Sequence, residues 1–297
     1  MLINKTTLDA LRKNFVGLYD ESFNKAEPKW DKVAMHVKSN TAANVYGWLG
    51  STTRVREWIG ERVLQNLAAH DFEIKNKNWE DTIAVDRNAI EDDNLGVYAP
   101  MVSMLGHDAA NFPDELVFSL LAAAFTTVGY DGQYLVDTDH PVLDESGNVT
   151  SVSNSGGGSG EPWFLIDDTK PIKPIIFQER RPFDFVALDD MKDENVFMRN
   201  EFIYGVDARM NVGTGLWQLI QGSKQDLTAE NYAARRAAMT SMKGDNGRPL
   251  RLKGSLLVVG PTNEEAAKEI LEAERNAAGA TNIHRGTAKL LVVPELG

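Results

Sequence analysis

Apolar residues recur at helical spacing between Glu91 and Val128, the longest periodic stretch of the chain. The stripe consists of Val97, Met101, Met104, Leu105, Ala109, Phe112, Leu116, Leu120, Leu121 and Ala124. This spacing predicts one long helix over Asp92–Val128, or two helices joined at a kink. Pro113 lacks a backbone donor, so we expect a bend near His107–Phe112. About 34 helical residues would make a rod of roughly 50 Å at 1.5 Å per residue, and such a rod needs the rest of the chain to pack against it.

Three shorter patterns precede this rod. Thr6–Asn24 is predicted to be an amphipathic helix capped by Thr6 or Thr7, which either docks on its own domain or reaches a neighbouring subunit. Val33–Val37 suits a short strand. Phe72–Ile90 alternates apolar and polar residues on both sides of Asn76–Asn78, which predicts a hairpin. A two-stranded hairpin is only marginally stable alone, so it must pack on a surface of this chain or of another copy. Between these patterns we expect Trp48 and Trp58 to anchor a core and Glu61–Ala68 to form a brief helix.

The second half alternates strand and helix patterns and predicts an α+β or α/β domain. Thr126–Gly160 is rich in Gly, Ser, Asp and Asn, which indicates a loop or a domain boundary. The expected strands are Trp163–Asp168, Lys173–Gln178, Val196–Val206, Leu250–Leu252, Leu256–Val259 and Leu290–Val293. The expected helices begin after Thr228 and Pro261 and run to about Met242 and Asn276.

Composition narrows the class of protein. The chain has 297 residues, a net charge of −12 and no cysteine. Disulfides and thiolate metal sites are therefore excluded, and a reducing compartment suits the protein. The acidic balance argues against a dedicated nucleic-acid-binding protein. No apolar run approaches the roughly 18 residues of a membrane span, and we expect neither a membrane segment nor a signal peptide.

Candidate chemistry is sparse. Asp137–Asn148 superficially resembles a calcium loop, but Val142 stands where such a loop needs Gly and no Glu closes it. His140, alone beside turn residues, is expected to be structural. Gly213–Gly215 lacks the third Gly of a phosphate-binding turn and is expected to be a loop. We therefore predict no catalytic, cofactor-binding or metal-binding residues, and a chain with this organisation looks like a structural building block.

Paired charges have a simple interpretation in so acidic a chain. The acidic pairs Asp92-Asp93 and Asp189-Asp190 are expected on the solvated surface. Arg180-Arg181 and Arg235-Arg236 could meet a carboxylate or a phosphate, with surface ion pairs as the default.

Long segments, taken together and in order, resemble a known family. They are NWEDTIAVDRNAIEDDNLGVYAP (78–100), PDELVFSLLAAAF (113–125), YDGQYLVDTDHPV (130–142), PWFLIDDTKPIKPIIFQERRPF (162–183) and EFIYGVDARMNVGTGLWQLIQGS (201–223). The series resembles the Mu-like major head subunit family, gpT, over nearly the entire chain. The resemblance implies an α+β, HK97-like phage major capsid protein fold. Under it, residues 1–68 would be the N-terminal arm and the start of the peripheral domain, 69–91 the extended-loop hairpin, and 92–128 the spine helix. Residues 129–297 would be mainly the axial domain, with strands returning to the peripheral domain.

The resemblance also implies a function. The chain would be a major capsid protein of a Mu-like tailed phage or prophage, assembling with many copies of itself into the hexamers and pentamers of an icosahedral shell around double-stranded DNA. Expected partners are a separate scaffold, a maturation protease and a portal, with only weak, non-specific DNA contact. We expect the protein in the virion and, during assembly, in the host cytoplasm. Lys75 and Lys77 lie on the predicted hairpin, but covalent cross-linking is not expected.

Two alternatives stay open at this point. An encapsulin-like nanocompartment shell protein would share the fold and enclose enzymes instead of DNA. A soluble hydrolase with an unrecognised acidic site would form a small, fixed oligomer.

Overall fold

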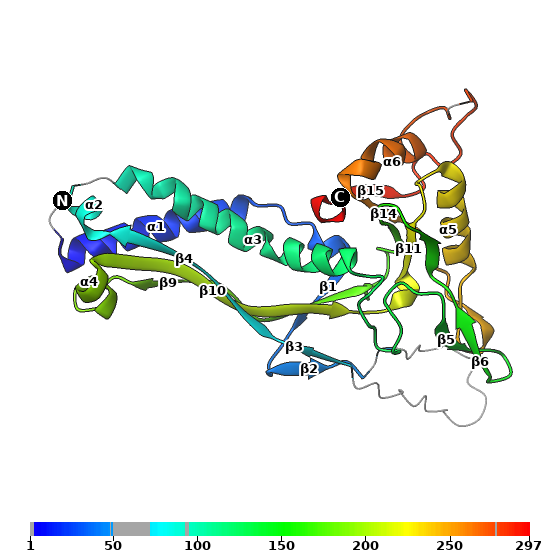
Figure 1. Ribbon diagram of the computed structural model, residues 1–297, viewed down its shortest axis with the longest axis horizontal. Coiled ribbons are helices and arrows are strands. Elements are labelled where there is room, and N and C mark those ends of the chain that lie inside the picture. The colour runs from blue at the N-terminus through cyan, green and yellow to red at the C-terminus, as the bar shows by residue number, and fades with distance from the viewer. Residues whose placement is uncertain (1–2, 48, 50–71, 93–94, 277) are drawn as a thin grey trace.

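The computed structural model describes residues 3–47, 49, 72–92, 95–276 and 278–297, and it shows an elongated α+β chain (Figure 1). One part is long and narrow, and the other is a more compact unit at the far end that carries α5 and α6. Trp48, Trp58 and Glu61–Ala68 lie outside the described residues, so the predictions made for them are untested.

The narrow part is built on a four-stranded sheet in the order β1-β9-β10-β4. Its strands are β1 (Ala34–Lys38), β9 (Ile175–Leu188), β10 (Glu201–Thr214) and β4 (Lys77–Asp86). β1 runs parallel to β9, and the other two pairings are antiparallel. Helices α1 (Lys5–Lys25) and α3 (Ala99–Ala122) pack on this sheet, and the short helices α2 (Arg87–Glu91) and α4 (Glu194–Arg199) lie at its tip (Figure 1).

The first helix was predicted correctly. It buries Leu8, Leu11, Phe15 and Tyr19, all members of the predicted stripe. Its cap is Asn4 rather than Thr6 or Thr7, because Thr7 occupies the third helical position and completes a reciprocal capping box with Asn4. Of the two alternatives for this helix, the structure shows the first, since α1 packs against α3 of its own chain.

The long helix is real but shorter than predicted. α3 spans 24 residues, about 36 Å, because the 3-10 turn Leu95–Val97 occupies the chain before it and the helix ends at Ala122 rather than at Val128. It remains one helix through Pro113. The predicted stripe was partly wrong: Met101 and Met104 are exposed, and the buried face includes Gly106 instead. A Cβ on Gly106 would stand 2.5 Å from the Tyr19 carbonyl oxygen, so the glycine allows α1 and α3 to approach closely.

The predicted hairpin Phe72–Ile90 is wrong. β3 (Glu73–Lys75) pairs with β2 (Ala43–Val45), whereas β4 pairs with β10 along its whole length. Asn76 lies between β3 and β4 and does not form a turn, because its side-chain amide donates to Ser39 Oγ and the Thr41 carbonyl. A ten-residue ladder between β4 and the distant strand β10 thus replaces the predicted local pairing. The antiparallel pair of β2 and β3 is a separate element, which we call the β2–β3 hairpin.

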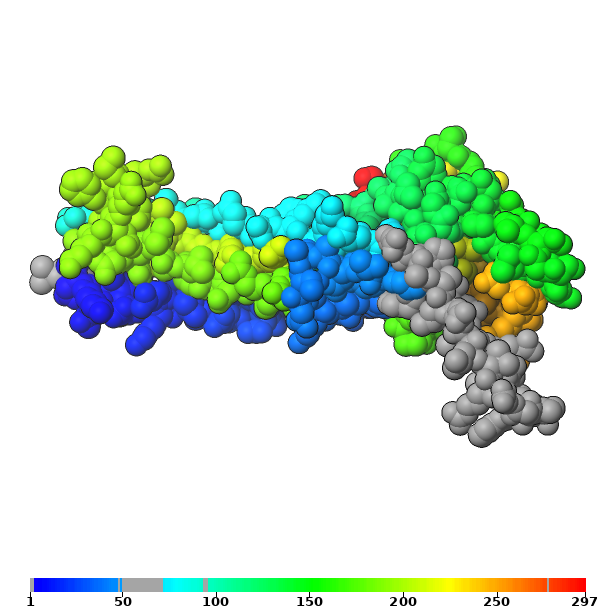
Figure 2. Space-filling view, turned by 90° about the horizontal axis from the view of Figure 1, so that it is seen from below, coloured from blue at the N-terminus to red at the C-terminus, as the bar shows by residue number. Residues whose placement is uncertain are grey.

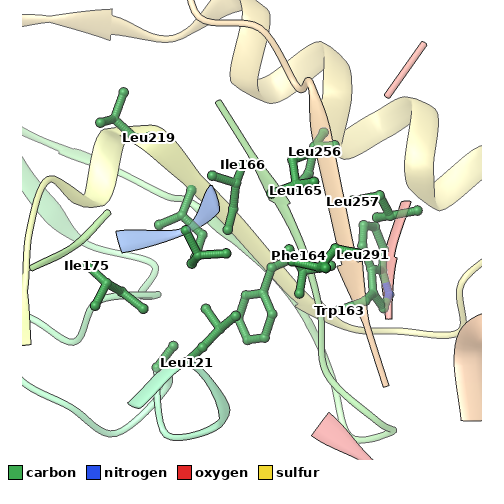
Figure 3. Close-up of a cluster of buried hydrophobic side chains, with 14 of the residues drawn as sticks. Leu121, Trp163, Phe164, Leu165, Ile166, Ile175, Leu219, Leu256, Leu257 and Leu291 are labelled. Carbon is green, nitrogen blue, oxygen red and sulfur yellow. The ribbon is translucent and has the colours of Figure 1, made fainter. Parts of the chain in front are cut away.

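The compact part contains a five-stranded sheet in the order β15-β14-β8-β11-β7. Its strands are β15 (Lys289–Val292), β14 (Leu256–Val259), β8 (Trp163–Ile166), β11 (Ile220–Lys224) and β7 (Ser155–Gly158). Helices α5 (Ala229–Ser241) and α6 (Glu264–Leu271) complete its core. β8 is buried at all four positions, and Phe164 lies among Leu121, Ile166 and Leu291 (Figure 3). Leu121 belongs to α3, so α3 takes part in both cores.

Four further predictions for the second half need correction. Thr126–Gly160 is not only loop, because it contains β5 (His140–Leu143), β6 (Val149–Val152) and β7. Val196–Val206 is not one strand, since its first four residues belong to α4. Leu250–Leu252 is not a strand, and α6 ends at Leu271 rather than near Asn276. In contrast, the helix capped by Thr228 and the strands at Trp163, Leu256 and Leu290 are confirmed.

Candidate assembly surfaces

The tip of the narrow part carries an exposed apolar surface on the sheet face that α1 and α3 leave open. Along β9, Phe183, Phe185 and Ala187 pack toward the two helices, so Val186 and Leu188 point to the opposite face. We call the surface formed by Val186, Leu188, Phe197 and Met198 the tip patch. Phe197 is 86% exposed and Met198 69% exposed. Figure 2, seen from the side away from α3, shows the segment around α4 projecting at this end.

A second exposed apolar surface lies at the start of α3. It is formed by Val97, Met101 and Met104, which we call the helix patch, and these side chains are 47–59% exposed. The chain carries no charged residue between Leu95 and Gly106. A helix face that meets only water is normally polar, whereas interface cores are depleted of charge and enriched in Met. The helix patch therefore has the composition of a contact surface.

The base of the β2–β3 hairpin is tied to the sheet by a buried polar network around Gln178. The Gln178 side chain accepts a hydrogen bond from Tyr46 Oη at 2.7 Å and donates to the Ile74 carbonyl at 3.0 Å and Asn76 Oδ1 at 2.8 Å. Gln178 is fully buried. Burial also raises the pKa of the Tyr46 hydroxyl, so this group stays protonated and can donate. The network fixes both strands of the hairpin relative to β9.

A groove of about 770 Å³ runs between α3, β4 and the C-terminal turn Pro294–Leu296. Its lining includes the aromatic residues Trp79, Phe112 and Phe183. It also includes the acidic residues Glu27, Glu80, Asp81, Asp108, Asp114, Glu115 and Glu295. Asp114 holds the segment after α1 in place, because its carboxylate accepts the backbone N–H groups of Lys29 at 2.8 Å and Trp30 at 2.7 Å.

Replacing Asp114 tests this anchor. We expect Asp114→Ala to lower the free energy of unfolding by about 2 kcal/mol, because two backbone donors lose a charged acceptor. Asp114→Asn keeps one acceptor oxygen, so its loss should stay below about 1 kcal/mol. Chemical denaturation of both variants at pH 7 measures the difference, and equal losses would contradict the anchoring role.

The same carboxylate gives a pH dependence. Burial raises the pKa of Asp114, although the amides of Lys29 and Trp30 act in the opposite direction. A folded-state pKa above the unfolded value means that the contribution of this group is full below the unfolded value and declines as pH rises through the folded one. The native protein should therefore gain stability relative to Asp114→Asn as the pH is lowered from 7 toward 4.

The compact part holds a second buried polar network, around His140 and Asn154. The His140 ring stacks on Trp217 with ring centroids 3.9 Å apart, and its Nδ1 lies 2.7 Å from Asp131 Oδ2. Asn154 Nδ2 donates to the carbonyl oxygens of Leu135, Trp217 and Ile220. Its Oδ1 faces His140 Nε2 at 3.2 Å. The structural role expected of His140 is confirmed.

The arginines singled out in the sequence are mostly bound to backbone oxygens. Arg235 donates to the Ser155 carbonyl, and Arg236 donates to the carbonyls of Gly254 and Thr287. Arg180 donates to the Ser39 carbonyl. Arg181 alone forms the expected surface ion pair, with Asp207. Three of these four side chains thus connect segments of the fold instead of meeting surface carboxylates.

The other candidates take structural positions. Asp189 is not solvated as predicted: its side chain is 10% exposed and pairs with Arg12 at 3.1 Å. Asp92 is exposed, whereas Asp93 lies outside the described residues. Gly213 and Thr214 are the buried end of β10 rather than a loop. Lys75 forms a surface ion pair, with its Nζ atom 3.9 Å from Glu73 Oε2. Among the described residues, no group of three or more His, Cys, Asp or Glu side chains could hold a metal ion, and no helix is long and apolar enough to cross a membrane.

The sequence patterns did not predict the two exposed apolar patches. The helix patch was missed because Met101 and Met104 were predicted to be core residues. The tip patch was missed because Phe197 and Met198 were predicted to lie in a strand, whereas they belong to α4. The charge-free run Leu95–Gly106 was the available signal for the helix patch.

Comparisons with known proteins identify close relatives. A family model described as Mu-like prophage major head subunit gpT matches residues 8–296. The protein named Major capsid protein of Escherichia phage Mu is 39% identical over 309 residues, which cover all of both chains. The Mu-like prophage FluMu major head subunit of Haemophilus influenzae is 42% identical over 282 residues, 91% of each chain.

Solved structures agree with these relatives. The procapsid of bacteriophage JBD30 contains a chain with a TM-score of 0.88 and 41% identity, covering 99% of this chain and 100% of that one. The capsid of the same phage contains a chain with a TM-score of 0.77 and 32% identity, covering 92% of each.

Proposed function

The chain belongs to the Mu-like prophage major head subunit gpT family, and from this membership we propose that many copies of it assemble into hexamers and pentamers of an icosahedral shell that encloses double-stranded DNA. The family is one of structural capsid proteins rather than enzymes, and its fold is HK97-like. The observation that carries the proposal is the similarity to the JBD30 procapsid chain over 99% of this chain.

The parts of the fold suggest roles in such a shell. The narrow part would be the peripheral domain, with α3 as its spine helix, and the compact part would be the axial domain that surrounds the five- and six-fold axes. β9 and β10 would be the strands that return to the peripheral domain. The extended loop would be the segment Ala43–Lys75, in place of residues 69–91, because β2 and β3 form the base of the hairpin.

Assembly of this kind needs no single strong contact. A shell holds each subunit through several neighbours at once, so each interface can be modest. The net charge of −12 supports weak, non-specific contact with packaged DNA, because phosphate binding scales with neutralising Lys and Arg. A separate scaffold, a maturation protease and a portal would act during assembly in the host cytoplasm, and the product would reside in the virion.

The two alternatives are less well supported. An encapsulin-like shell protein would share the fold, but the family match is to phage and prophage head subunits. A soluble hydrolase has no support from the family or from the arrangement of the described residues. The genes beside this one discriminate further, since terminase and portal genes accompany a phage head subunit.

The proposal predicts visible assembly. We expect shells, tubes or six-membered rings when the protein is produced with its neighbouring genes, and fewer or less regular particles when it is produced alone. Negative-stain microscopy with sedimentation measures this. A monodisperse monomer or dimer under both conditions would refute the proposed function.

A further inference from the structure

We infer that the tip patch of one subunit packs on the helix patch of a neighbouring copy, a contact that rests on the proposed shell function. Both patches lie at the same end of the narrow part, on opposite sides of its layers: α4 lies below the sheet in Figure 1, and α3 lies above it. One chain cannot bring the two together. A second copy can, and a single kind of contact then covers both surfaces.

The open face of the sheet explains why a helix should be the partner. A sheet that buries one face against helices is stable when its other apolar positions are also covered. On the covered face, α3 already packs on β10 and β9 of its own chain. On the open face near the tip, Leu188 pairs with Ile203, which in turn pairs with Ala84, and this gives an apolar row across three strands. The outer side of a neighbour's α3 would supply the missing helical layer there.

Composition favours these two surfaces over the rest of the open face. Further from the tip, that face turns polar at Asp207 and Arg209. The helix patch has no charge that would be left unpaired on burial, and Met side chains adapt to an aromatic partner such as Phe197. Two tip patches facing one another would instead bring Asp190, before α4, and Glu194, its first residue, close to their own copies.

The exposed area fits a contact that forms only within a shell. At about 150–250 Å² for a large side chain, the exposed parts of the seven side chains amount to roughly 600–1,000 Å². A stable binary complex needs about 1,200–2,000 Å². The contact is therefore too small to hold a free dimer, and it contributes when other interfaces hold the subunits in place. Because the two surfaces lie on opposite sides of the narrow part, each copy meets two different neighbours, so the contact is heterologous and can continue from copy to copy around a closed ring.

The absence of cysteine from the sequence allows a direct test by disulfide trapping. Particles are assembled with the neighbouring genes from Met104→Cys, Phe197→Cys or the double variant, then oxidised and analysed on non-reducing gels. We expect disulfide-linked oligomers of three or more chains from the double variant, and no cross-links from either single variant. Val149→Cys, an exposed position on β6 in the compact part, is the matched control and should stay monomeric on the gel.

Each other outcome has a distinct meaning. Dimers from Phe197→Cys alone or Met104→Cys alone would show contacts between like patches and overturn the heterologous contact. Normal particles with no cross-link in the double variant would overturn it as well. Failure of the unmodified protein to form any particle would instead refute the proposed function. As a second measurement, Met104→Glu should reduce the particle yield at least tenfold while the subunit remains folded by circular dichroism, and an unchanged yield would also contradict the contact.

Discussion

Asn154→Leu is expected to lower the free energy of unfolding by about 3–5 kcal/mol, because a fully buried hub of hydrogen bonds is replaced by an apolar side chain of similar size. The three carbonyl oxygens that Asn154 Nδ2 contacts would lose a donor. The Asp137 N–H, 2.8 Å from Oδ1, would lose its acceptor. His140 Nε2 would lose its polar partner 3.2 Å away, deep beside Trp217. Each buried group left alone costs about 1–3 kcal/mol, and the losses are not fully additive.

Denaturant unfolding of the purified subunit measures this loss. Asn148→Leu is the matched control, because Asn148 lies at the exposed turn between β5 and β6 and its side chain donates only to Asp144. We expect the control to change stability by less than about 0.5 kcal/mol. A loss below about 1 kcal/mol for Asn154→Leu would show that the loop before β7 adjusts and that the network does not hold the compact part together.

The hydrophobic pattern predicted correctly those helices and strands whose buried residues can be recognised from their own sequence. The helix around Phe15 and the strand at Leu256 have uniform apolar faces, so spacing alone identified them. Patterns failed where partners are distant in sequence. β4 prefers ten residues of β10 to the nearby β3, and no feature of Phe72–Ile90 reveals this. Gly106 is a poor helix former in the sequence, yet its lack of a side chain lets α1 and α3 approach closely.

Single polar residues that organise a fold are equally hard to predict. Asn154 stands in a run of Ser and Gly that resembles a linker, and its partners include residues 63 and 66 positions away. Gln178 stands at the end of an apolar run, more than 100 residues from Ile74 and Asn76. The two exposed apolar patches were missed for a related reason. An exposed apolar residue looks the same in a sequence as a buried one, and the difference appears only when the chain leaves its side chain uncovered.

Gln178→Leu is expected to loosen the base of the proposed extended loop and to lower the free energy of unfolding by about 2–4 kcal/mol. The substitution removes three buried hydrogen bonds at once, from the Tyr46 hydroxyl, to the Ile74 carbonyl and to Asn76 Oδ1. Tyr46→Phe removes one hydrogen bond of the same network and should cost about 1 kcal/mol. The backbone ladder between β2 and β3 is only three residues long, so it cannot hold the hairpin base by itself.

Hydrogen exchange separates this local effect from general destabilisation. In the native protein the Tyr46 amide donates to the Phe72 carbonyl and the Asn76 amide to the Ala42 carbonyl, and both should exchange faster in Gln178→Leu. Amides of β8, in the other core, should exchange at nearly native rates. Particle yield should fall with the exchange protection at Tyr46 and Asn76, because a loop that reaches a neighbour must leave its own subunit in a fixed direction. Faster exchange at both amides with a native yield of particles would mean that the segment between β2 and β3 does not join subunits, and the assignment of the extended loop to Ala43–Lys75 would then be wrong.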